Sequence, residues 1–380
     1  MEAFRVMMQF SLAGLGFNLV AFFAATIVIV FVHEFGHFIV GRWCGVKIET
    51  FSVGFGREIF GFNDKYGTRW KFSWLPLGGY VKFLGDANAA SMPSVTSDPT
   101  PGSLQAASVG RRAAIVAAGP IANFLLAVVI FAAAYSIVGT PINEPRADEV
   151  PVDGAAYAAG IVPGDYIRAI DGTPIHSFVD IQRAMIMQGD TPIRMSVERN
   201  KQMHDVNIVP KVIETVDNLG HKNRVSLIGL KHDFRKDPVG FERLSPIAAV
   251  GKGVQETVFI VKTTLRYVGK LFAGREKSDQ LHGPIGVAQM AGEQASQGPW
   301  SFITFIALIS VSIGLVNLFP IPMLDGGHLV FYLIEAVFGK PVGPVAQEWS
   351  FRIGLSAMVL LMLFATNNDL SPYVNKVFGW

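Results

Sequence analysis

The sequence is poor in cysteine and in charge. Cys44 is the only cysteine among 380 residues, so no disulfide can form within the chain, and a zinc site built from four cysteines is excluded. Charged residues make up 16% of the chain, whereas a soluble domain carries about 25%. A disordered chain, a coiled coil and a basic nucleic-acid-binding protein are therefore excluded, and the net charge of +2 favours no particular partner.

Charge is missing from long continuous stretches. Residues 6–32, 113–138 and 300–323 contain no Asp, Glu, Lys or Arg, and each stretch exceeds the roughly 20 residues that cross a bilayer. A weaker run covers 349–366, with Arg352 near its start, where the side chain can reach the membrane surface. Helices of a soluble core are rarely this long, and the first run is too long for a signal peptide. We therefore expect four transmembrane helices in a lipid bilayer.

The positive charges predict an orientation. Nine Lys or Arg residues lie between the first and second apolar runs, whereas Arg5 alone precedes the first run. By the positive-inside rule, 41–112 is cytosolic, and both termini and 139–299 are outside. The nine residues are Arg42, Lys47, Arg57, Lys65, Arg69, Lys71, Lys82, Arg111 and Arg112.

The segments between the runs differ in pattern. Residues 46–84 alternate polar and apolar side chains and predict strands beside the membrane, and 86–110 reads as a flexible linker. Residues 139–240 predict a small β-rich domain with a helix over 178–187 and hairpins over 193–209 and 211–231. Residues 245–275 predict a basic amphipathic helix, on the membrane surface or packed on the soluble domain. The fold expected is an α+β membrane protein: a four-helix transmembrane core, a membrane-associated β element and one exterior β-rich domain.

These patterns predict seven segments. They are the first transmembrane helix (1–45), the cytosolic β element with its linker (46–110), the second transmembrane helix (111–138), the exterior β-rich domain (139–240), the amphipathic helix with a connector (241–299), the third transmembrane helix (300–338), and the fourth transmembrane helix with an exterior tail (339–380).

The first apolar run ends in a metal-binding pattern. His33-Glu34-Phe35-Gly36-His37 is an HExxH motif, in which two imidazoles on one helix face can bind Zn²⁺ and the glutamate beside them can act as a general base. The motif interrupts apolar sequence, and Arg42 follows His37 at about 8 Å along a helix. The site is therefore expected inside the membrane near its cytosolic face, where such polar groups are costly without a metal or a partner.

A catalytic zinc usually has a third protein ligand. The third run ends in a segment broken by Pro320, Pro322 and Gly326-Gly327, which offers Asp325 and His328. Broken helices at membrane depth line cavities, but chemistry alone leaves the two candidates open, since Asp325 could also cap a helix. Asn317 could polarise a substrate carbonyl or bond a neighbouring helix. Gly119-Pro120 and Asn123 are interpreted as permitting close packing or a kink.

Together, these motifs resemble the site-2 protease family of intramembrane zinc metalloproteases, and within it the bacterial regulators of sigma-E signalling. The resemblance rests on HEFGH at 33–37, GPIANF at 119–124, and the NxxPxPxLDG pattern from Asn317 to Gly326. PLGGYV at 76–81 and GPIG at 283–286 also look like family signatures. The motifs occur in the family's order, from about residue 18 to 335.

The resemblance implies roles for individual residues. His33, His37 and Asp325 would be the zinc ligands and Glu34 the general base, with His328 a neighbour that does not bind the metal. Asn317 would lie near the substrate. The strand with Gly78, Gly79, Tyr80 and Val81 would pair with an unwound substrate, and 139–212 would be a PDZ domain that binds a peptide or protein segment. Only one such domain is found, as in the shorter members of the family.

The implied activity is zinc-dependent cleavage of a transmembrane segment. The expected substrate is a single-pass membrane protein already trimmed outside, such as an anti-sigma factor. The expected location is the bacterial inner membrane, with the termini and the PDZ domain in the periplasm. Two alternatives stay open: a membrane-anchored zinc protease acting on soluble or loop substrates, and a non-catalytic PDZ scaffold or metal transporter. The apolar runs hold almost no acidic residues, which disfavours a transporter.

Overall fold

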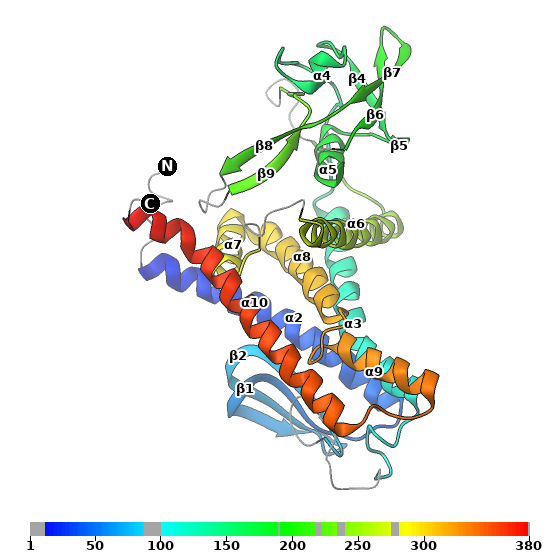
Figure 1. The fold of residues 1–380 in the computed structure, drawn as a ribbon, viewed down its shortest axis with the longest axis vertical. Helices are drawn as coiled ribbons and strands as arrows, with labels where there is room; N and C mark the ends of the chain where they lie inside the picture. Colours follow the sequence, from blue (N-terminus) through cyan, green and yellow to red (C-terminus); the bar gives the residue numbers. More distant parts are fainter. Residues whose placement is uncertain are drawn as a thin grey trace. The chain divides into compact units, whose positions relative to one another are not determined.

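The computed structural model describes residues 12–86, 100–188, 191–216, 222–233, 240–274 and 281–378 (Figure 1). The described residues form two compact units. The first is drawn from Met1–Phe131, Gly253–Val261 and His282–Ser371, and the second from the remainder. Much of the predicted linker, residues 87–99, lies outside the described residues.

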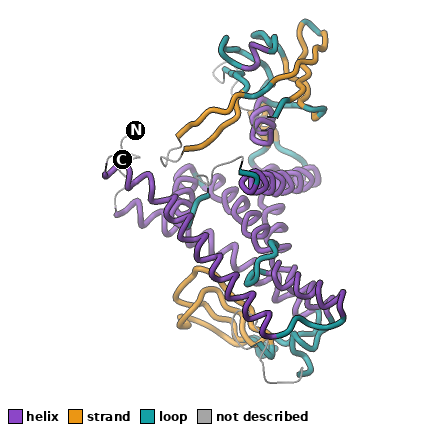
Figure 2. Tube along the Cα trace, viewed as in Figure 1, coloured by secondary structure: helices purple, strands orange, loops and turns teal. Residues whose placement is uncertain are grey.

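Helices dominate the first unit (Figure 2). They are α2 (Leu12–Trp43), most of α3 (Val109–Ile137), α7 (Pro284–Gln297), α8 (Pro299–Asn317), α9 (Asp325–Phe338) and most of α10 (Pro344–Phe378). Four of these helices, α2, α3, α8 and α10, are long and apolar enough to cross a membrane, which confirms the four predicted apolar helices. α10 is longer than the predicted 349–366. α7 is not predicted from the sequence, in which its residues belong to the expected connector within 241–299.

The third apolar run is broken where the prolines predict a break. α8 ends at Asn317 and α9 begins at Asp325, so 300–338 holds two helices rather than one. Gly326 and Gly327 make the tight first turn of α9 possible. A Cβ at Gly326 would lie 2.2 Å from the carbonyl oxygen of Phe319, and one at Gly327 would lie 2.5 Å from that of Ile321. The two glycines therefore let Asp325 start a helix directly over the broken segment.

The predicted strands over 46–84 are confirmed as a bent antiparallel hairpin, β1 (Ile48–Asn63) and β2 (Arg69–Phe83). Residues 50–53 of β1 pair with 69–72 on one side and with 79–82 on the other. Among the described residues, no further strand pairs with the outer edge of 79–83. Phe51, Val53 and Val81 share a buried cluster with Phe38 of α2, so the apolar side chains of the sheet hold it against the HExxH helix.

The second unit is β-rich, as predicted. Its strands form a four-stranded sheet and two antiparallel pairs: β5 (Thr173–Pro174), β4 (Tyr166–Ile170), β6 (Ile193–Arg199) and β7 (Gln202–Ile208) in that order, β3 (Thr140–Ile142) with β10 (Gly240–Glu242), and β8 (Lys211–Val216) with β9 (Lys222–Leu227). Two helices accompany them, α4 (Ala155–Ala158) and α5 (Phe178–Gln188). Ile167, Met195 and Val197 are fully buried in one apolar core with Phe178. The predicted helix over 178–187 and both predicted hairpins are confirmed.

The predicted amphipathic helix is also present as α6 (Pro246–Phe272). Ser245 caps its start, where the hydroxyl accepts a hydrogen bond from the backbone N–H of Ala248, and Pro246 occupies the first turn.

Candidate metal centre

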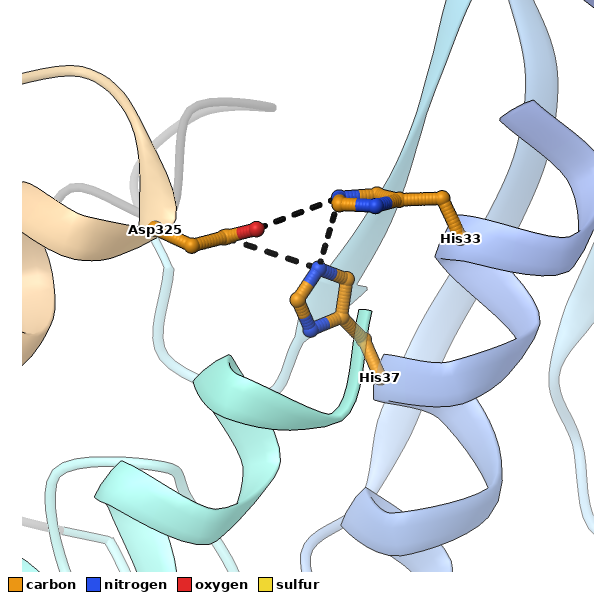
Figure 3. Close-up of side chains that lie close together, drawn as sticks. All are labelled: His33, His37 and Asp325. Carbon is orange, nitrogen blue, oxygen red and sulfur yellow. Dashed lines mark hydrogen bonds and ion pairs between the residues drawn. The ribbon is translucent and has the colours of Figure 1, made fainter. Parts of the chain in front are cut away.

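His33, His37 and Asp325 converge on one point (Figure 3). Nε2 of His33 lies 3.2 Å from Oδ2 of Asp325, and Nε2 of His37 lies 3.5 Å from Oδ1. The two Nε2 atoms are 3.2 Å apart. The histidines are four positions apart and therefore share one face of α2, and the first turn of α9 brings Asp325 to them. His328, the other candidate ligand, is not part of this group. Its ring lies beside that of Phe351, with the two ring centres 5.4 Å apart.

The donor set fits a zinc ion. Tetrahedral zinc with bonds of about 2.0–2.2 Å holds its ligand atoms roughly 3.3–3.6 Å apart, close to the three separations found. Nδ1 of His37 donates to the carbonyl oxygen of Ile115 at 2.8 Å, which leaves a lone pair on Nε2. Oδ2 of Asp325 is buried and accepts no hydrogen bond of regular geometry from the described residues. Buried lone pairs that face one another in this way repel unless a cation is bound between them.

The central helix α3 closes the site from the third side. A Cβ at Gly119 would lie 2.3 Å from Nε2 of His37 and 2.9 Å from Cε1 of His33, so only glycine fits beside the two rings. A Cβ at Gly36, inside the HExxH motif, would lie 2.4 Å from the carbonyl oxygen of Ala118. Pro120 loosens α3 because it lacks an N–H. The GPIANF motif therefore borders the metal centre, which the sequence reading did not predict.

Asn123 is the second site residue that the sequence reading missed. Its side-chain amide lies 3.3 Å from Nδ1 of His33, and the residue is fully buried. Ser310 of α8 donates to the backbone carbonyl of Asn123 at 2.9 Å. The polar residue in an apolar run was the available signal, but nothing in the sequence showed which helix it faces.

The predicted base and the predicted substrate strand lie together. The backbone N–H of Val81 lies near the carboxylate of Glu34. A Cβ at Gly79 would lie 3.0 Å from Cγ of Glu34 and 2.7 Å from the carbonyl oxygen of Ser52, so a glycine is required where the strand passes α2. Tyr80 stacks on Phe55 with ring centres 6.0 Å apart.

Gly78 and Asn317 make no hydrogen bond with His33, His37 or Asp325 among the bonds of the described residues. Gly78 has a φ of +147°, a conformation that suits glycine. Asn317 is the last residue of α8, and its half-buried side chain makes no hydrogen bond with the described residues.

A polar cluster ties the end of α2 to the turn between β1 and β2. Arg42 bonds the carboxylate of Asp64 and donates to Thr68 Oγ1 at 3.0 Å, and its guanidinium lies over the ring of Tyr66 at 4.3 Å. Burial raises the pKa of Asp64, but backbone N–H donors at Thr68 and Tyr66, with Trp70 and Arg42, hold that pKa below its ordinary value. The cluster fixes the sheet against the helix that carries Glu34.

A second ion pair joins α3 to α9. Arg112 makes a bidentate pair with Glu335, at 3.0 and 2.6 Å, with both side chains largely buried. The guanidinium also lies over the ring of Tyr332 at 5.0 Å. The pair holds the helix that begins at Asp325 against the helix that borders the histidines.

The site combines two histidines and an aspartate that can bind zinc with a glutamate that can act as a base, and it lies among apolar helices. This combination defines a membrane zinc metallopeptidase. The sequence profile of peptidase family M50 matches residues 21–361, and the chain belongs to this family, the site-2 proteases. It is a zinc metalloprotease, so the alternative of a non-catalytic scaffold is wrong.

Bacterial relatives agree with this assignment. A protein of Rhizobium meliloti named as a zinc metalloprotease is 45% identical over 378 residues, covering 98% of this chain and 100% of that one. One of Agrobacterium fabrum is 46% identical over 362 residues, 94% of this chain and 96% of that one. Metalloprotease MmpA of Caulobacter vibrioides is 38% identical over 382 residues, 93% and 95% of the two chains.

Proposed function

We propose that the protein is an intramembrane endopeptidase that cleaves the transmembrane segment of single-pass membrane proteins. The observation that carries the proposal is the position of the site on the membrane helices. His33 and His37 lie within the apolar span Gly14–Trp43, and His37 is about 9 Å along the helix from Trp43. A peptide bond cut there is a bond inside or at the edge of the bilayer.

His33, His37 and Asp325 would hold the zinc ion, and Glu34 would act as the general base. Bound zinc supplies Lewis-acid polarisation of a carbonyl and lowers the pKa of water. The carboxylate of Glu34 would accept a proton from the attacking water and would return it to the leaving amine. The backbone N–H of Val81, which lies near Glu34, would help to orient its carboxylate.

The substrate must unwind, because a helix hides its backbone in its own hydrogen bonds. The edge of 79–83 supports strand pairing as the way in which those bonds are replaced. The backbone N–H of Val81 lies near the carboxylate of Glu34, and Gly79, two residues away on the same strand, is expected to face the same edge. A substrate strand bonded at Gly79 would therefore lie beside the general base. The side chain of Asn317 makes no hydrogen bond with the described residues, and it is the proposed partner of a substrate carbonyl.

A backbone change in the substrate tests the pairing without disturbing the enzyme. N-methylation of a single substrate residue near the cut removes one N–H. Cleavage should fall at alternate positions only, because alternate residues bond the edge strand. A uniform effect at successive positions would contradict strand pairing. Replacing Gly79 in the enzyme is a poorer test, since a new side chain would also strike Ser52 and Glu34.

The β-rich second unit is proposed to be a PDZ-like domain in the periplasm that binds a peptide segment and excludes untrimmed substrates. The protein would lie in the bacterial inner membrane with 41–112 in the cytosol and both termini outside, and anti-sigma factors are the proposed substrate class. Thr140 pairs directly with Glu242 across β3 and β10, so 141–241 can be replaced by a short Gly-Ser linker. That variant should cut full-length substrate, and continued dependence on prior trimming would contradict the filter.

The activity itself is tested with purified protein in detergent, zinc and a single-pass model substrate. Wild type should cut within the transmembrane segment, and Glu34→Gln should bind one zinc ion without cutting. If neither protein cuts but both bind zinc, the substrate or its preparation is wrong. If neither binds zinc, the ligand assignment is wrong.

The remaining alternative, a protease acting on soluble or loop substrates, places the motif outside the lipid. A cysteine at 35 in a Cys44→Ser background separates the two cases. Position 36 is unsuitable because a side chain there would strike Ala118. Phe35→Cys should react poorly with a membrane-impermeant thiol reagent, and rapid labelling would favour the alternative.

A further inference from the structure

The buried amide of Asn123 faces a ring nitrogen of a proposed zinc ligand. The residue is fully buried on α3, and its amide nitrogen is 3.3 Å from Nδ1 of His33. Its other amide atom, Oδ1, is buried and has no hydrogen-bond partner among the described residues. Proton abstraction and substrate binding, as proposed above, leave this residue without a role.

Asn123 is part of α3, and contacts with α8 hold it in place. Ser310 of α8 donates to its backbone carbonyl at 2.9 Å, and a Cβ at Gly314 would lie 3.2 Å from its own Cβ. Close packing between α3 and α8 therefore holds the amide in front of His33, while the amide group remains able to turn about its last side-chain bond.

Zinc binding constrains the protons on His33. A neutral imidazole carries one N–H, so a lone pair on Nε2 requires the proton on Nδ1. His37 meets this requirement by donating from Nδ1 to the carbonyl oxygen of Ile115. The group that faces Nδ1 of His33 is the Asn123 amide, and an acceptor is supplied there when Oδ1 faces the ring.

We propose that Asn123 is a positioning residue for the metal centre. With its amide turned so that Oδ1 accepts from Nδ1–H of His33, it holds the ring with the Nε2 lone pair toward His37 and Asp325. Helix α3 would then orient both histidines, one through the Ile115 carbonyl and one through Asn123. Partners of this kind fix the orientation and raise the basicity of metal-binding histidines. The inference rests on the proposed assignment of His33 as a ligand.

Two substitutions separate positioning from packing. Asn123→Leu keeps the size and removes the acceptor, whereas Asn123→Asp keeps an acceptor oxygen and adds a buried charge. A packing role predicts that Asp is the more damaging change, because an unpaired charge in an apolar interior is costly. A positioning role predicts the opposite order for zinc affinity, since a carboxylate accepts from Nδ1–H at least as well as an amide.

The measurement is zinc affinity of the full-length protein in detergent, by competition with a chromogenic chelator and without substrate. We expect Asn123→Leu to bind zinc about 10–100-fold more weakly than wild type and Asn123→Asp to stay within a few-fold of it. Cobalt-loaded protein gives a second readout, in which the visible absorption should change for Leu and persist for Asp. Ser312→Ala, whose hydroxyl bonds within its own helix, is the control and should bind zinc as wild type does.

Wild-type affinity in Asn123→Leu, or a larger loss in Asn123→Asp than in Asn123→Leu, would overturn the proposal. His33→Ala, measured beside them, separates this failure from that of the ligand assignment. If His33→Ala loses zinc and Asn123→Leu does not, Asn123 alone is wrongly assigned. If His33→Ala keeps full affinity, the ligand assignment itself fails.

Discussion

Gly119 offers a direct test of the geometry at the metal centre, because one added methyl group reaches the proposed ligand atoms. A Cβ at this position would lie 2.3 Å from Nε2 of His37, 2.5 Å from Cε1 of the same ring and 2.9 Å from Cε1 of His33. Ordinary van der Waals contact begins near 3.4 Å. Gly119→Ala must therefore move the His37 ring by about 1 Å, whereas zinc sites tolerate shifts of about 0.2 Å.

The same helix contains a matched control. Gly110 lies in the first turn of α3, and a Cβ there meets nothing within 4 Å. Alanine is the better helix former by up to about 1 kcal/mol, so both substitutions favour the helix itself. The local effect on α3 is thereby matched, and only the contact with the histidines differs.

Zinc content and zinc affinity of the purified proteins measure the outcome. We expect Gly119→Ala to bind zinc at least ~100-fold more weakly than wild type, at the upper end of the losses seen when the surroundings of metal ligands are changed, and to lose proteolysis with it. Gly110→Ala should equal wild type in both. Affinity of Gly119→Ala within a few-fold of wild type would refute the placement of α3 against the two rings.

Four further outcomes follow from the contacts described. Gly36→Ala should lower the thermal midpoint in detergent by the equivalent of about 1–3 kcal/mol, because the new Cβ would clash with the Ala118 carbonyl. Gly16→Ala is the control and should not lower the midpoint, because a Cβ there has no atom within 4 Å. Equal midpoints for the two variants would contradict the close packing of α2 against α3. The pKa of Asp64 is lowered in the folded protein, so Asp64 contributes stability at neutral pH, and this contribution is lost as the pH falls through the ordinary pKa of about 4 and then through the lower pKa of the folded state. In thermal melts, Asp64→Asn should therefore lose less stability than wild type over this acid range. Identical pH profiles of the two proteins would contradict this prediction. Glu335→Gln should destabilise the protein by roughly 3–5 kcal/mol by leaving Arg112 buried and unpaired, and an Arg112→Met/Glu335→Leu double variant should recover part of this in the same melts. Removing zinc with a chelator should lower the thermal midpoint of wild type and of Glu34→Gln alike, and an unchanged midpoint would argue against a metal bound in the folded core.

The elements of the fold were largely predictable because membrane helices and alternating strands leave strong local patterns. The four apolar runs and the strands over 46–84 were found from hydropathy and period alone. The ends of the helices were harder to predict. α10 extends to Phe378, because polar residues such as Asn367 and Asp369 end the apolar run without ending the helix. α7 was missed because its small residues, Gly286, Ala288 and Ala291, are buried by packing and carry no apolar stripe.

The proposed ligands were predictable in a different way. His33 and His37 share a helix face by spacing alone, whereas the choice of Asp325 over His328 came from family resemblance. The structure brings Asp325 to the histidines because a broken segment and two glycines let a helix begin there. Gly119 and Asn123 could not be assigned, because their roles depend on distances between helices that are far apart in sequence. A glycine that relieves a tertiary clash has the same local signature as one that permits a kink.

The arrangement explains how a polar centre persists among apolar helices. Each polar group must find a partner where water is scarce, and α3 supplies partners to both histidines: the Ile115 carbonyl to His37 and the Asn123 amide to His33. The same helix makes room for the rings at Gly119 and is fastened to α9 by Arg112 and Glu335. The HExxH helix therefore carries two of the proposed ligands, but their geometry is set by the neighbouring helix, and changes in α3 should weaken zinc binding although α3 itself carries no ligand.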